Sequence, residues 1–118
     1  MTVRATREGL VGKQTATGWV IDTETAFVAL PSHRALHRFV KVTNPLNGKS
    51  VNAQVLDVGP WNEHDEAYVF GGARPAAEFG QSVSGNGTNG AGIDLGEYVW
   101  HALGMEGNTD VEWDFILQ

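Results

Sequence analysis

The alternation of hydrophobic and polar residues in the middle of the chain predicts a β-hairpin. Valines alternate with other residues over positions 39–43, and small apolar residues recur at every second position over 51–55. This period of two is typical of a strand with one buried face. Asn47-Gly48 lies between the two segments, and this dipeptide favours the tight turn of a hairpin.

A second pattern, in "GIDLGEYVWHALGMEG" (92–107), predicts a helix. Asp94 is placed to cap its first turn, and Glu97, three residues later, would complete a capping box. Gly104 suits the C-terminal stop. The apolar positions that would share one face are Leu95, Val99, Ala102 and Leu103.

Further strands are predicted on both sides of these elements. The segments 18–22 and 25–30 are short and β-prone, and "VEWDFIL" (111–117) places Val111, Trp113, Phe115 and Leu117 on one side. Trp100 and Trp113 are expected in the core. Strands before and after one capped helix indicate a mainly β fold, a small β-barrel with a helix packed on it.

The length and charge of the chain limit its function. With 118 residues it is expected to form a single domain. Residues 1–50 carry seven Lys and Arg against three acids, and residues 51–118 carry one Arg against eleven acids. An acidic domain without a basic cluster is a poor ligand for nucleic acid, since phosphate neutralisation supplies most of that affinity.

Cysteine usage and hydropathy exclude other classes. The sequence has no cysteine, so disulfides and thiolate-zinc sites are ruled out. No segment approaches the roughly 20 apolar residues of a membrane helix, and no secretory signal is visible. We therefore expect no membrane insertion, and nothing in the sequence demands more than a monomer.

Two carboxylates are candidates for catalysis. Asp57 ends the second strand of the predicted hairpin, directly before the Gly59-Pro60-Trp61 break. It can close the strand through backbone N–H groups, or act as a general acid/base if partial burial or a second carboxylate raises its pKa. Asp94 is the second candidate, and a capping role does not prevent it from presenting an oxygen to a site.

Aromatic and histidine side chains are further candidates for ligand contacts. Trp61 and Trp19 are the tryptophans expected at the surface, where an indole stacks well on a sugar. His33 and His37 lie four residues apart but lack a third ligand at a recognisable spacing. We therefore predict no metal and no cofactor.

Taken together, the motifs resemble a known barrel family. In order, the segments are "TATG" (15–18), "ALP" (29–31), "VKVTNPLNGKSVNAQVLDVGPW" (40–61) and "GIDLGEYVWHALGMEG" (92–107). They resemble the rare lipoprotein A (RlpA-like) branch of double-psi β-barrels, which is related to the expansin, barwin and endoglucanase-45 barrels. The resemblance covers roughly residues 12–117, apart from most of 62–91.

The resemblance implies a six-stranded barrel with short helices and a shallow groove for cell-wall polysaccharide, either peptidoglycan or plant-type glycans. Some members of this branch are lytic transglycosylases, in which an acidic residue protonates the glycosidic oxygen. Asp57 falls on their catalytic aspartate and Asp94 on the aspartate of I-D-L-S. Trp61, Trp19 and Asn44 are the candidates for substrate binding. A bacterial envelope or secreted location also follows from the resemblance.

The chain also departs from the family pattern. Trp19 stands where the family has a glutamate, Phe27 where it has a histidine, Val58 where it has an arginine, and Gly96 where it has a serine. A Gly-rich insertion occupies about residues 62–91.

Three functions therefore remain open: cleavage of a glycan through Asp57, glycan binding without catalysis, and binding of a protein partner through the insertion.

Overall fold

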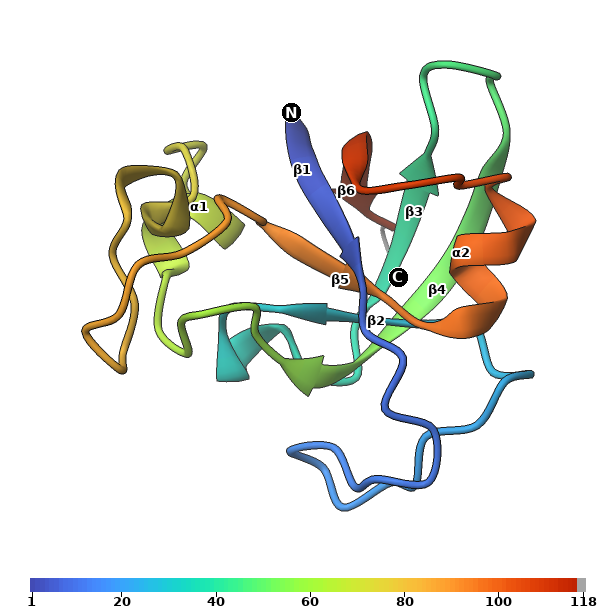
Figure 1. The fold of residues 1–118 in the computed structure, drawn as a ribbon, viewed down its shortest axis with the longest axis horizontal. Helices are drawn as coiled ribbons and strands as arrows, with labels where there is room; N and C mark the ends of the chain where they lie inside the picture. The colour runs from blue at the N-terminus through green and yellow to red at the C-terminus, as the bar shows by residue number, and fades with distance from the viewer. Residues whose placement is uncertain (117–118) are drawn as a thin grey trace.

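The computed structural model describes residues 1–116, in which six strands close into a barrel (Figure 1). The strands are β1 (Thr2–Arg7), β2 (Phe27–Leu30), β3 (Phe39–Thr43), β4 (Ser50–Val58), β5 (Ile93–Leu95) and β6 (Thr109–Phe115). Their order around the barrel is β1-β5-β2-β4-β3-β6. The β1/β5 and β2/β4 pairs are parallel, and the other four pairs are antiparallel. The predicted six-stranded barrel is confirmed.

The helical segments are short. They are η1 (His33–Ala35), α1 (Glu66–Val69), η2 (Ala76–Phe79) and α2 (Glu97–Ala102). In Figure 1, α2 packs on one side of the barrel, and the segment that contains α1 lies on the other side. No helix in the described part of the chain has the length and apolar character needed to cross a membrane.

The predicted hairpin is confirmed. β3 and β4 pair antiparallel, with Val40 opposite Ala53 and Val42 opposite Val51. Gly48 has a φ of 76° in the connecting turn, a conformation that glycine adopts without steric cost. The buried valines of this hairpin join the core of the barrel.

The prediction that the helix starts at Asp94 was wrong. Asp94 lies inside β5, and the helix begins only at Glu97, with Gly96 as a cap that offers no side-chain hydrogen bond. Strand pairing overrides the local capping pattern, because β5 is held between β1 and β2. The predicted end holds: Gly104 has a φ of 64° and its N–H donates to the His101 carbonyl.

The N-terminal region also differs from expectation. β1 was not predicted, although Val3 and Ala5 alternate with exposed neighbours and are fully buried. The predicted strand at 18–22 is reduced to a single bridge between Gln14 and Val20. The final strand is confirmed as far as Phe115, and Leu117 lies outside the described residues.

Part of the 62–91 segment packs against the barrel. Tyr68, in α1, is buried; its hydroxyl accepts a bond from Trp113 Nε1 (2.8 Å) and donates to the Gly92 carbonyl (2.9 Å). These bonds tie the segment to β6 and to the start of β5. Trp113 and Trp100 are buried, as predicted.

Candidate functional site

The two predicted carboxylates lie on the same row across the sheet. Ala29 of β2 is paired with Asp94 on one side and with Asp57 on the other, and Thr6 of β1 is paired with Asp94. Residues directly opposite one another in a sheet share a face. Since neighbouring strands lie about 4.8 Å apart, the two aspartate backbones are separated by roughly two strand spacings, with only the small Ala29 methyl between them.

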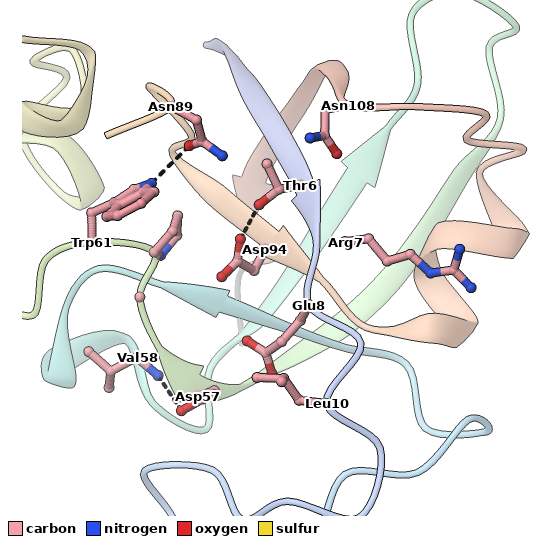
Figure 2. Close-up of a pocket in the computed structure, with 12 residues that line it drawn as sticks. Thr6, Arg7, Glu8, Leu10, Asp57, Val58, Trp61, Asn89, Asp94 and Asn108 are labelled. Atoms are coloured by element: carbon pink, nitrogen blue, oxygen red, sulfur yellow. Dashed lines mark hydrogen bonds between the residues drawn. The ribbon is translucent and has the colours of Figure 1, made fainter. Parts of the chain in front are cut away.

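A third carboxylate joins this pair. Glu8 directly follows β1, where its N–H donates to the Leu95 carbonyl (2.9 Å). Figure 2 shows its side chain directed toward the region between Asp57 and Asp94. Oε2 of Glu8 is buried and has no hydrogen-bond partner. Three acidic side chains, from β4, from β5 and from the residue that follows β1, therefore line the same cavity.

Burial and mutual repulsion change the acidity of two of them. Burial raises the pKa of Glu8 to about 8, and the charges of Asp57 and Asp94 and a hydrogen bond to Asp57 raise it further. Burial likewise raises the pKa of Asp94 to about 6; the bond from Thr6 opposes this, and the charge of Asp57 adds to it. At neutral pH the site therefore holds at least one proton.

Asp57 is held in place by the backbone. Its Oδ1 accepts bonds from the N–H groups of Ala16 (2.8 Å) and Val58 (2.9 Å). The first comes from the loop after β1 and the second from β4 itself. The carboxyl group is thereby fixed at the strand end, and its second oxygen is left for other partners.

These carboxylates line an open cavity of about 580 Å³, which we call the carboxylate groove; it also includes Trp61, Asn89 and Asn108. Trp61 has a φ of 68°, an uncommon conformation for a bulky residue and one that clusters at functional sites. Its Nε1 donates to Asn89 Oδ1 (2.8 Å). This bond, drawn in Figure 2, fixes the indole at one side of the groove.

Arg7 does not neutralise the groove. Its guanidinium forms two hydrogen bonds with Glu97, at 2.7 and 2.5 Å, and lies over the Trp100 ring. In Figure 2 the side chain extends toward α2 and away from the carboxylates. The groove therefore presents acceptor oxygens and one protonated carboxyl group, an arrangement that suits the hydroxyl groups of a sugar.

Two of the predicted site residues lie elsewhere. Trp19 packs edge-on against Phe27, with ring centroids 4.9 Å apart, and is not among the residues that line the groove. Asn44 is buried in the β3–β4 turn, where Nδ2 donates to the Leu103 carbonyl (2.9 Å) and Oδ1 accepts from the Leu46 N–H. The structure thus brings together Asp57, Asp94 and Trp61, but not Trp19 or Asn44.

Two of the four positions that depart from the family pattern, Trp19 and Phe27, belong to an apolar cluster. Phe27 is fully buried with Ile21 and Leu56, and Trp19 packs against them. A Cβ added at Gly96 would overlap the Phe27 ring, with even Cζ only 2.9 Å away. The phenylalanine and the glycine are therefore complementary, since the ring occupies the space that a side chain at Gly96 would need.

We expect Gly96→Ala to destabilise the protein by about 1–3 kcal/mol, because the new methyl overpacks a closed core. Urea unfolding measures the effect. Gly107→Ala is the matched control, since a Cβ there meets nothing within 4 Å. If Gly96→Ala were as stable as the control, the packing of Phe27 against Gly96 would be wrong.

Among residues 1–116, no group of three or more His, Asp or Glu side chains is arranged to hold a metal ion. His33 stacks on His64 with ring centroids 5.2 Å apart.

Sequence reasoning missed Glu8, although the sequence contains a pattern that points to it. Glu8 directly follows β1 and precedes Gly9, and Asp57 is the last but one residue of β4, two positions before Gly59. In both places a carboxylate stands near the end of a strand, within two residues of a glycine.

Comparison with solved structures identifies the fold. An expansin mutant from Clavibacter michiganensis in complex with cellohexaose is 21% identical, with a TM-score of 0.56; the match covers 99% of this chain and 51% of the expansin chain. Cerato-platanin 3 from M. perniciosa is 11% identical (TM-score 0.54; 98% and 94% covered). A Streptomyces papain inhibitor is 16% identical (TM-score 0.53; 96% and 92%). The chain thus spans about half of the expansin.

These likenesses establish the double-psi β-barrel fold that the sequence resemblance implied, the fold of the expansin and cerato-platanin structures. No curated protein matches the chain. One family model matches residues 1–77, a range that includes Glu8, Asp57 and Trp61, whereas Asp94 lies beyond it. The chain belongs to the family described as Domain of unknown function (DUF8814).

Proposed function

We propose that the carboxylate groove binds a strand of cell-wall polysaccharide and that Asp57 cleaves it as a general acid/base. The observation that carries this proposal is the arrangement of three carboxylates beside a fixed indole in an open cavity of about 580 Å³. Carboxylates accept hydrogen bonds from sugar hydroxyls, and the indole offers a flat apolar face to a sugar ring.

The shape of the groove suits a polymer. A second cavity of about 360 Å³ shares Asn108 with the carboxylate groove and extends toward the β3–β4 turn. A strand that entered beside Trp61 and passed the carboxylates would continue over Asn108. Amide side chains at Asn89 and Asn108 offer both donors and acceptors along this path.

Cleavage requires a proton on the leaving oxygen and an acceptor for the proton of the attacking hydroxyl. The groove holds a proton at neutral pH, because burial and neighbouring charge raise the pKa of Glu8 to about 8 and of Asp94 to about 6. Asp57 is the proposed acid/base because two backbone N–H groups fix its carboxyl group in the groove.

One observation favours a second candidate, glycan binding without catalysis. Trp19 and Phe27 occupy positions where the resemblance implies polar partners, and they form an apolar cluster beside the groove. A barrel of this kind would retain the binding surface and lack the reaction. The expansin complex with cellohexaose makes cellulose the second polymer to test beside peptidoglycan.

We expect Trp61→Ala to weaken binding to insoluble peptidoglycan or cellulose by about 1–3 kcal/mol, a loss of the size of one stacking contact. Co-sedimentation of the protein with each polymer measures the affinity. Trp19→Ala should bind like the parent, because Trp19 packs against Phe27 outside the groove.

Phe79→Ala is the matched control, since this exposed aromatic residue in η2 lies outside the groove. Binding of Trp61→Ala equal to that of the parent would remove Trp61 from the site. Failure of the parent to bind either polymer would refute the proposed function.

A further inference from the structure

We propose that Glu8 is the positioning residue of the carboxylate groove: its carboxyl group holds the proton that Asp57 passes to the substrate. This proposal rests on the proposed function and names the source of its proton. No part of the sequence resemblance assigns a role to Glu8, which precedes the segments that carry it.

The backbone places Glu8 where it can do this. Arg7 is the last residue of β1 and pairs with Leu95, and the Glu8 N–H then donates to the Leu95 carbonyl (2.9 Å). The residue is thus fixed at the end of the parallel β1/β5 pair. Figure 2 shows its carboxyl group directed toward Asp57, with Asp94 on the other side.

The surroundings of the Glu8 carboxyl group require a proton. Oε2 is buried and has no partner, and an unpaired buried charge is costly. Of the charged groups that face Glu8, Asp57 comes from β4 and Asp94 from β5, and both repel a second negative charge. The neighbouring cation, Arg7, is bound to Glu97. A protonated Glu8 relieves this repulsion by donating a hydrogen bond to Asp57.

The two groups are suited to different parts of one proton transfer. Asp57 is anchored through Oδ1 by two backbone N–H groups, so its orientation in the groove is fixed. Glu8 has no such anchor on its carboxyl group and donates to Asp57. Burial and the negative charge of Asp57 keep the proton on Glu8 until the pH approaches 8.

Glu8 passes its proton to Asp57, and Asp57 donates that proton to the glycosidic oxygen while the bond from that oxygen to the anomeric carbon breaks. The attacking hydroxyl, from water or from the sugar itself, forms the new bond to the anomeric carbon. Its proton returns to the Asp57–Glu8 pair, which ends the cycle as it began.

Carbon-detected NMR titration of the side-chain carboxyl groups tests the proposal without any glycan, and Glu8→Gln assigns the Glu8 resonance. We expect Glu8 to titrate near pH 8 and its midpoint to fall by at least one pH unit in Asp57→Asn. In Asp57→Asn the Glu8 midpoint should still lie above the ordinary value of 4.5, because the Glu8 carboxyl group is still buried. A Glu8 midpoint near 4.5 in the parent, or one unchanged in Asp57→Asn, would overturn the proposal.

A pH profile of glycan release separates this role from a purely structural one. The parent should lose activity only above about pH 8, where Glu8 gives up its proton. Glu8→Gln should lose activity at a pH at least one unit lower than the parent does. An unchanged profile would contradict the role of Glu8. If the parent neither bound nor cleaved glycan, the proposed function would fail, while the titration would still decide where the proton resides.

Discussion

Replacing Asp57 with asparagine is expected to lower the release of soluble glycan from peptidoglycan or cellulose by roughly 10²–10⁴-fold, the usual contribution of a general acid/base. The amide oxygen of asparagine can still accept the bonds from Ala16 and Val58, so the fold and the groove should be retained. The amide cannot exchange a proton with the glycosidic oxygen. Mass spectrometry of the soluble fraction after digestion measures the products and shows whether they carry an anhydro ring.

The matched control is Asp114→Asn, the same chemical change at an exposed position of β6 outside the groove. It should release glycan like the parent. Equal product from the parent and Asp57→Asn would remove Asp57 from the reaction. Binding without product from either protein would assign the chain to the non-catalytic candidate.

The second large effect is a loss of stability as the pH rises. The pKa of Glu8 is raised from 4.5 to about 8 on folding, and that of Asp94 from 3.8 to about 6. In this window the folded state binds more protons than the unfolded state, so the free energy of unfolding falls with increasing pH. Each pKa unit corresponds to 1.36 kcal/mol, and solvent screening in the open groove reduces the effect. We therefore expect the free energy of unfolding to fall by roughly 2–3 kcal/mol between pH 5 and 8.5.

Urea unfolding at these two pH values measures the loss in the parent and in Glu8→Gln. The variant carries no titrating group at this position, so its stability should depend less on pH, and it should be the more stable protein at pH 8.5. The carboxylates whose pKa is lowered, Asp22 and Glu97, act below this window, where protonation removes their stabilising bonds. A parent whose stability rises from pH 5 to 8.5 would contradict the burial of the Glu8 carboxyl group.

The parts of the fold that the sequence predicted are those determined locally. The β3–β4 hairpin follows from alternation and an Asn-Gly turn, and β6 follows from alternation alone. Asp57 and Trp61 could be predicted as site residues because they stand where a strand ends at a Gly-Pro break. In each case, neighbouring residues carry the information.

Other parts depend on contacts between distant segments. The sequence around Asp94 predicts a helix cap, but pairing with β1 and β2 keeps this residue in a strand. The sequence around Trp19 predicts an exposed aromatic residue that stacks on a sugar. In the structure the Trp19 ring packs against the Phe27 ring instead, with the two centroids 4.9 Å apart. Glu8 lies 49 positions from Asp57 in a polar N-terminal segment, and only closure of the barrel brings them together.

The central claim is that a polysaccharide binds in the carboxylate groove, and the indole N–H resonances of the four tryptophans test it most directly. We would record their NMR spectrum during titration with cellohexaose and with soluble peptidoglycan strands. The Trp61 resonance should shift or broaden, because its N–H bonds to Asn89 at the edge of the groove. Those of Trp100 and Trp113, both buried, should stay in place. Saturating binding that left Trp61 unchanged and moved other resonances would place the glycan elsewhere and contradict this account.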